Sequence, residues 1–91
     1  MAGEHRAILV YGTTWCPDCE RARRLLDAHR VRYDWIDVDQ DPAAVAHIET
    51  LNHGMRTVPT IVFPDGSILS EPSNRQLLER IAGLLLANRP L

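Results

Sequence analysis

The fold is decided by residues 7–19, AILVYGTTWCPDC, in which an apolar run leads through a short loop to two cysteines. Residues 7–11 show no alternation of polar and apolar side chains and are bounded by Gly12, a pattern typical of a strand buried on both faces. Pro17 suits the first position of a helix, because the N–H that proline lacks would have no partner there. The stretch therefore predicts a central strand and a helix, with the cysteines at their junction.

Hydrophobic periodicity extends this start into a β-α-β unit. From Pro17 the apolar side chains follow helical spacing to about Arg30. Residues 33–38 then have the pattern of a second strand. A connection of this length through a helix makes the second strand parallel to the first. The helix also carries three arginines, interpreted as a solvated face, at Arg21, Arg23 and Arg24.

A second helix and a hairpin follow. Asp41 before Pro42 is an N-cap followed by a first helical position, and Gly54 ends this helix. Residues 60–63 indicate a third strand. The turn residues after it return the chain antiparallel, so residues 68–70 are expected to form an edge strand.

A third helix closes the chain. Ser73 and Gln76 form a capping box, and an apolar stripe that includes Ile81 follows them. No repeat or linker interrupts the pattern. We therefore predict a single α/β domain over residues 1–91, with a four-stranded mixed sheet and three helices in the order β-α-β-α-β-β-α.

Composition and charge narrow the classes of function. The 91 residues contain 10 Lys and Arg against 12 Asp and Glu, a formal net charge of −2. This balance gives no electrostatic case for nucleic acid or for an anionic membrane as a partner. The apolar run near the start is too short for a signal peptide or a membrane span, so we expect a cytoplasmic protein. In that reducing compartment, two cysteines three apart indicate a redox or metal-binding role rather than a structural disulfide.

The position of the cysteines at a helix start favours redox chemistry. Cys16 precedes Pro17 and is the expected N-cap, so its sulfur would face free backbone N–H groups and the positive end of the helix dipole. Both favour the thiolate, which is the attacking species in disulfide exchange. Cys19 lies one turn deeper on the same face. We predict that Cys16 is the nucleophile and that Cys19 is the resolving thiol.

Half of a zinc site is the alternative reading of the same Cys-X-X-Cys spacing. A closed site needs two further ligands, and no histidine has the paired spacing that completes the usual pattern. The four histidines are His5, His29, His47 and His53. We expect no bound metal, and a metal-binding or interaction module remains the non-enzymatic alternative.

A second motif, TVP at residues 57–59, lies directly before the third predicted strand. From the residues alone it indicates a trans proline at a strand start. Together with CPDC at residues 16–19 and the final hairpin and helix, it resembles the glutaredoxins over nearly the whole chain. The resemblance implies the thioredoxin fold, thiol-disulfide oxidoreductase activity and a cis bond between Val58 and Pro59.

The resemblance also implies a binding site for a small thiol around the first cysteine. The Val58 backbone would face the active-site sulfur and pair with the cysteinyl backbone of the thiol. No tightly bound cofactor is expected, because the thiol is a co-substrate. The predicted substrate-binding residues are Thr13, Thr14, Trp15, Pro17, Arg56, Thr57, Val58, Pro59 and Ser70.

Mycothiol is the small thiol that the resemblance favours. Glutathione carries two carboxylates, and glutaredoxins usually meet them with a lysine before the first cysteine and a Gly-Gly pair near the last helix. Residues 12–14 and 69–73 lack that signature. Residues 52–60, NHGMRTVPT, with the turn and cap residues that follow, instead resemble the mycoredoxins, actinobacterial relatives of glutaredoxins whose thiol has no carboxylate. Glutathione stays the alternative, and Arg56 fits a carboxylate ligand as well as a solvated arginine.

The predicted activity is the reduction of mixed disulfides between proteins and mycothiol. Its partners would be the small thiol, proteins that carry such disulfides and a reductase system that recycles the thiol, and the chain is expected to be a monomer. A glutathione-dependent glutaredoxin and a thioredoxin-like protein disulfide reductase are the alternative enzymes.

Overall fold

The computed structural model describes residues 7–87 and has the predicted order of elements. A short 3-10 helix, η1, follows the second strand and was not predicted. The elements are β1 (Ile8–Gly12), α1 (Pro17–Ala28), β2 (Tyr33–Asp37), η1 (Val38–Gln40), α2 (Pro42–Leu51), β3 (Thr60–Val62), β4 (Ile68–Ser70) and α3 (Asn74–Ala87).

Three elements end earlier than their sequence patterns predict. α1 stops before Arg30, whose φ of 57° is left-handed and cannot continue a right-handed helix. β2 stops before Val38, because the Asp37 carboxylate accepts a hydrogen bond from the Asp39 N–H and starts η1. β3 stops before Phe63, whose N–H closes the hairpin on the Ser67 carbonyl instead.

The sheet has the strand order β2-β1-β3-β4, with β1 beside β3 at its centre. β1 pairs parallel with β2 and antiparallel with β3, and β4 pairs antiparallel with β3 at one edge. The predicted central first strand, parallel second strand and edge strand are therefore confirmed. In the β1–β3 register Tyr11 lies opposite Thr60, so the end of β1 and the start of β3 meet.

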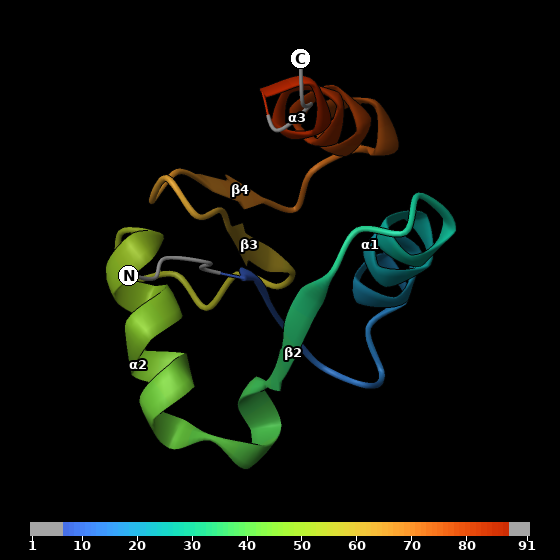
Figure 1. Cartoon of the computed structure of the whole chain (residues 1–91). Coiled ribbons are helices and arrows are strands. Elements are labelled where there is room, and N and C mark those ends of the chain that lie inside the picture. Colours follow the sequence, from blue (N-terminus) through green and yellow to red (C-terminus); the bar gives the residue numbers. More distant parts are fainter. Residues whose placement is uncertain (1–6, 88–91) are drawn as a thin grey trace.

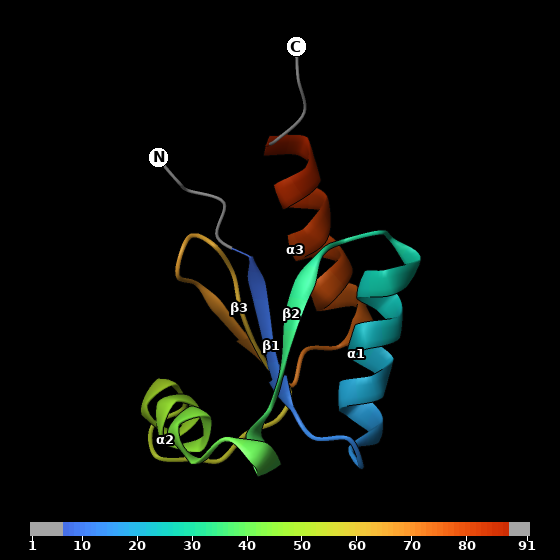
Figure 2. The same cartoon turned by 60° about the horizontal axis from the view of Figure 1, so that its bottom comes forward.

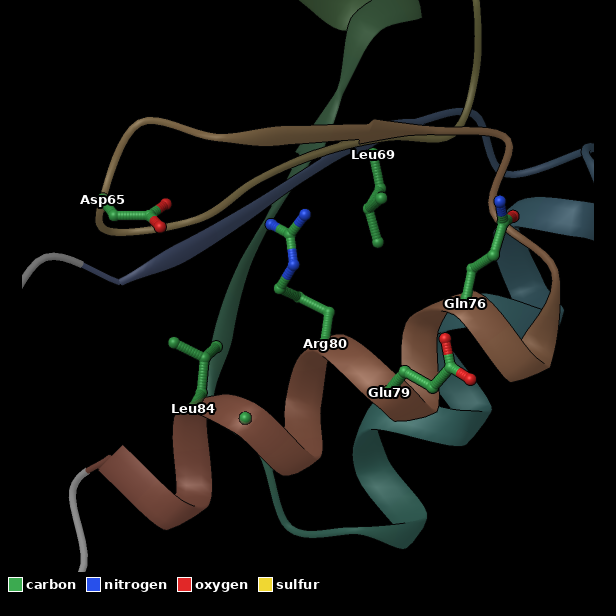
Figure 3. Close-up of a pocket in the computed structure, with 7 residues that line it drawn as sticks. Asp65, Leu69, Gln76, Glu79, Arg80 and Leu84 are labelled. Carbon is green, nitrogen blue, oxygen red and sulfur yellow. The ribbon is translucent and has the colours of Figure 1, made fainter.

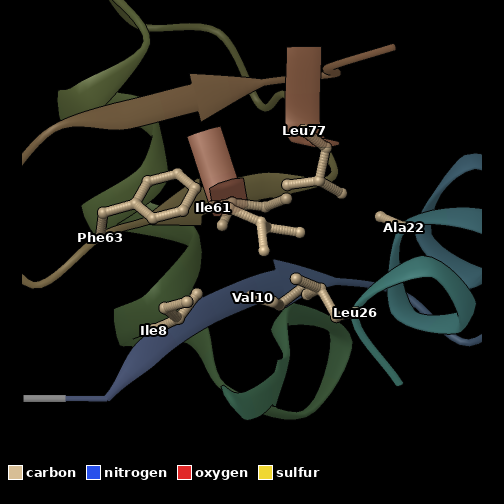
Figure 4. Packing of buried hydrophobic residues seen from close by; sticks show 8 residues of the cluster. Ile8, Val10, Ala22, Leu26, Ile61, Phe63 and Leu77 are labelled. Atoms are coloured by element: carbon tan, nitrogen blue, oxygen red, sulfur yellow. The ribbon is translucent and has the colours of Figure 1, made fainter. Parts of the chain in front are cut away.

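Helices cover both faces of the sheet (Figure 1, Figure 2). Alternate residues of β1 serve the two faces, because side chains point to opposite sides along a strand. Ile8 and Val10 pack with α1 and α3, whereas Leu9 and Tyr11 pack with α2. The cluster under α1 and α3 is shown in Figure 4 and consists of Ile8, Val10, Ala22, Leu26, Ile61, Phe63, Leu77 and Ile81.

The predicted caps of α2 and α3 are both present. The Asp41 carboxylate accepts a hydrogen bond from the Ala44 N–H at 3.3 Å before α2. Before α3, the Gln76 N–H donates to the Ser73 hydroxyl at 3.1 Å, and the Ser73 N–H donates to the Gln76 side chain at 2.9 Å. These caps satisfy backbone donors that the helices themselves leave free.

The arginines of α1 are not a uniformly solvated face, which corrects the sequence interpretation. Arg21 donates to the Pro72 carbonyl at 3.0 Å and so ties α1 to the segment before α3. The Arg23 guanidinium lies 4.1 Å from the ring centre of Trp35, a cation–π contact. Arg24 is exposed and pairs with Glu20, as a solvated residue would.

Candidate active site

Cys16 is the N-cap of α1, as the sequence predicts. Its backbone is extended, with φ −93° and ψ 114°, and Pro17 takes the first helical position. The Cys19 N–H donates to the Cys16 sulfur at 3.2 Å. A negative charge on this sulfur is therefore stabilised by a backbone donor and by the positive end of the helix.

Cys19 has a different environment one turn further on. Its side chain is fully buried, whereas Cys16 retains 9% of its surface. Burial and then a side-chain hydrogen bond with Cys16 raise the pKa of the Cys19 thiol to about 12. Cys19 therefore keeps its proton at neutral pH, and Cys16 is the less buried of the two thiols.

Gly12 allows the end of β1 to lie directly against this pair. A Cβ atom at Gly12 would be 2.7 Å from the Cys19 sulfur and 2.7 Å from the nearest atom of the Trp35 ring. Both distances are well below van der Waals contact. The absence of a side chain at Gly12 is thus what lets the Trp35 indole pack behind Cys19, a role that the sequence did not reveal.

The Val58–Pro59 peptide bond is cis, as the resemblance to glutaredoxins implied. It directly precedes Thr60, which the sheet register places opposite Tyr11 near the end of β1. Pro59 is buried and Val58 is half-buried. The predicted proline motif therefore reaches the same end of the sheet as the loop that leads to Cys16.

A polar network fixes this proline loop to α2 and β4. Asn52, at the C-terminal cap of α2, donates through its side-chain nitrogen to the Thr60 hydroxyl at 3.1 Å, and that hydroxyl donates to the Thr57 carbonyl at 2.7 Å. The Ser70 hydroxyl donates to the Asn52 side-chain oxygen. Asn52 and Thr60 were not predicted as site residues, because their role depends on a contact between segments that only the folded chain brings together.

A second group of contacts involves Trp15, the residue before Cys16. The Trp15 indole is 71% exposed, and its Nε1–H donates to the Asp39 carboxylate at 2.8 Å. The Arg56 guanidinium contacts the same carboxylate at 3.5 Å. The structure thus brings the predicted residues Trp15 and Arg56 together through Asp39, which the sequence did not single out.

The other predicted substrate-binding residues differ in exposure. Thr14 and Pro17 are exposed beside Cys16. Thr13 has only 3% of its surface exposed, and its hydroxyl is buried without a hydrogen-bond partner in the described part of the chain. Ser70 is exposed, but its hydroxyl is engaged by Asn52. The Thr13 hydroxyl is therefore buried and the Ser70 hydroxyl is already hydrogen-bonded, so neither group is free at the open surface of the site.

A cavity of about 560 Å³ lies away from the cysteines, between α3 and the β3–β4 hairpin (Figure 3). Its lining residues are Asp65, Leu69, Gln76, Glu79, Arg80, Gly83 and Leu84. Arg80 is already engaged there, with the Ser67 hydroxyl and the Phe63 ring. The chemistry of the cysteine pair is not located in this cavity.

Neither a cluster of metal ligands nor a membrane-spanning helix is present within residues 7–87. No group of three or more His, Cys, Asp or Glu side chains in this range is arranged to hold a metal ion. None of the helices there has the length and apolar character needed to cross a bilayer.

Comparison with known proteins gives this geometry its context. Residues 8–69 match the family model described as glutaredoxin. A Mycobacterium tuberculosis protein that is provisionally named a glutaredoxin is 41% identical over 80 residues, which cover 85% of this chain and 95% of that protein. Mycoredoxin 1 of Corynebacterium glutamicum is 36% identical over 77 residues, with the same two coverages. The crystal structure of a glutaredoxin from Archaeoglobus fulgidus has a TM-score of 0.73 at 24% identity, covers 85% of this chain and 88% of its own, and confirms the predicted fold.

Proposed function

Because the chain belongs to the glutaredoxin family and is a thiol-disulfide oxidoreductase with Cys16 and Cys19 as its redox pair, we propose that it reduces mixed disulfides between proteins and mycothiol. The observation that carries the proposal is the asymmetry of the pair: Cys16 caps the helix and retains 9% of its surface, whereas Cys19 is fully buried and protonated. The identity with a mycoredoxin and the eroded glutathione signature favour mycothiol as the thiol.

The first step is attack of the Cys16 thiolate on the mycothiol sulfur of the mixed disulfide. The bond between the two substrate sulfurs breaks, and the protein leaves as a thiolate that takes a proton from water. The protein thiol is thereby released and the disulfide is transferred to the enzyme, where Cys16 is joined to mycothiol. Trp15, Thr14 and the Val58 backbone form the proposed wall for the small thiol.

Two routes return the enzyme to its reduced form. A second mycothiol thiolate attacks the bound mycothiol sulfur, which releases the Cys16 thiolate and the symmetrical disulfide. Alternatively, Cys19 loses its proton, attacks the Cys16 sulfur and releases mycothiol. The Cys16–Cys19 disulfide that remains is then reduced by two further mycothiol thiols, which leave as the symmetrical disulfide. The high pKa of Cys19 disfavours the second route unless a base removes the proton as the attack occurs.

The proposed setting follows from this chemistry. A redox pair of this kind turns over in the reducing cytoplasm, where disulfides do not persist. A reductase that returns the symmetrical disulfide to mycothiol completes the cycle. We propose that the protein acts as a monomeric single domain, since each step uses residues of one chain.

Turnover of a peptide joined to mycothiol by a disulfide tests the proposal. Cys16→Ser is expected to abolish activity, whereas Cys19→Ser should retain most of it, because the route through a second thiol needs only Cys16. The same peptide carrying glutathione, assayed with glutathione as reductant, is the comparison. Equal or faster turnover with glutathione would reject mycothiol as the preferred thiol and leave a glutathione-dependent glutaredoxin.

A further inference from the structure

We propose that Asp39 determines specificity at this site by disfavouring thiols that carry carboxylates. The inference rests on the proposed function for the position of the small thiol beside Cys16. Asp39 belongs to η1, at the end of β2, and has no part in the disulfide exchange itself. It acts through the two predicted substrate-binding residues that it contacts.

The two oxygens of the Asp39 carboxylate have different partners. Oδ2 accepts the indole N–H of Trp15 at 2.8 Å, and Oδ1 faces an Arg56 nitrogen at 3.5 Å. Trp15 directly precedes Cys16, and Arg56 lies three residues before the cis-proline. One carboxylate therefore connects the loop that leads to Cys16 with the loop that leads to the cis-proline.

The position of Asp39 is itself fixed by the local backbone. Its N–H donates to the Asp37 carboxylate at 3.0 Å, which caps η1. The preceding Val38 is buried in the core beneath α2. The buried Val38 and the Asp37 cap thus fix the backbone of Asp39, although the Asp39 side chain is 37% exposed.

The contact with Asp39 partly neutralises the positive charge of Arg56. Arg56 is 53% exposed and would otherwise attract the carboxylate of an incoming thiol. With Asp39 at 3.5 Å from Arg56, the positive charge that an anionic ligand would meet is partly cancelled by a neighbouring negative charge. The Asp39 contact also holds the exposed Trp15 ring in place, so an uncharged ligand group finds an aromatic surface.

The test compares two substrates that differ only in charge. One peptide is joined by a disulfide to glutathione, and the other to glutathione diethyl ester, in which both carboxylates are esterified. The measured quantity is the ratio of kcat/KM for the anionic substrate to kcat/KM for the ester. A structural defect lowers both values together and leaves this ratio where it was.

Asp39→Asn removes the charge but keeps an oxygen that can accept the Trp15 N–H. We expect the ratio to rise about threefold, the size of one exposed ion pair that becomes available. The rise should shrink at high salt and disappear in the Asp39→Asn/Arg56→Gln double variant. Asp34→Asn, at an exposed position of β2, removes the same formal charge and should leave the ratio at the wild-type value.

Two results would overturn the inference. One is an unaltered ratio in Asp39→Asn, and the other is an equal rise in Asp34→Asn, which would show only the effect of net charge. Failure of the proposed function is distinct, because it is read from wild-type turnover of the mycothiol substrate. A protein that rejects mycothiol but shows the predicted shift would retain Asp39 as a determinant of charge selectivity.

Discussion

Cys16 and Cys19 are identical side chains whose reactivity is set by one turn of helix. The first sits at the start of α1, where the Cys19 N–H faces its sulfur, and the second lies inside the core beside Gly12. The sequence predicted this division because spacing and Pro17 fix which cysteine caps the helix. It did not predict Gly12, because the need for a missing Cβ arises only from contacts between β1, β2 and α1.

Selective alkylation tests the difference between the thiols. At pH 8, iodoacetamide is expected to modify Cys16 and leave Cys19 unmodified, because a thiol with a pKa of about 12 is ionised in about one molecule in ten thousand. Peptide mass spectrometry measures the labelling of each cysteine. Protein unfolded in urea should label at both, and comparable labelling of both in the folded protein would contradict the prediction.

Gly12→Ala is expected to destabilise the protein by about 1–3 kcal/mol, the usual cost of an atom forced into a packed region. The added methyl would meet the fully buried Cys19 sulfur and the edge of the Trp35 ring at less than 3 Å. Urea denaturation provides the free energy of unfolding. Gly83→Ala is the control, because open space surrounds that helical position and alanine favours helix. Equal stability of the two variants would show that the contact at Gly12 relaxes freely.

At the scale of elements, the sequence predicted the three α-helices and four strands, but not η1 or the exact ends of the elements. Capping residues gave the starts of α2 and α3, because the donors they satisfy are local. The end of α1 depends on the left-handed backbone of Arg30. Glycine is the usual sequence signal for that conformation, and it is absent at this position. The missed contacts of Arg21 and Arg23 are with residues distant in sequence, so helical periodicity alone placed these side chains in solvent.

Asn52 is the residue through which α2 holds the proline loop, so its loss should affect binding. Asn52→Ala removes the donor to Thr60 and the acceptor of Ser70, and should cost about 1 kcal/mol of stability. Because Val58 would be less well fixed, KM for the mixed disulfide is expected to rise more than kcat falls. Steady-state kinetics separates the two quantities.

Thr50→Ala is the matched control, since the Thr50 hydroxyl bonds only within the exposed face of the same helix. Its KM should equal that of the wild type. A KM of Asn52→Ala that also equals the wild-type value would disconnect the network from substrate binding.

For the whole molecule, buried Cys19 predicts a loss of stability at alkaline pH. The folded-state pKa, about 12, lies above the ordinary value of 9.0, so folding favours the protonated thiol. Its contribution is fully present below pH 9 and declines as pH rises towards 12, by at most roughly 1.4 kcal/mol per pH unit. Cys19→Ser lacks this titration. The difference in unfolding free energy between wild type and Cys19→Ser should therefore shrink from pH 8 to 10.5, and a constant difference would refute the linkage.

The overall architecture was predictable because short connections and the β-α-β rule leave few arrangements for these elements. Apolar runs identified the central strands, and turn residues identified the hairpin. The site was predictable as far as its motifs reach, at Cys16, Cys19 and the proline loop. The roles of Asp39, Asn52 and Gly12 were not predictable, because each depends on contacts between segments that become neighbours only in the folded chain.

The pairing of Tyr11 with Thr60 has a consequence for how this chain tolerates added residues. The cysteine loop and the proline loop both leave the sheet beside that pair, whereas the Asp65–Gly66 turn lies at the opposite end of the hairpin. Extra residues in the turn would lengthen a solvent loop and leave the reactive end of the sheet undisturbed. A single residue inserted within β1 would instead rotate every later side chain to the other face, carrying Gly12 away from Cys19. Natural and engineered length variation should therefore be confined to the hairpin turn.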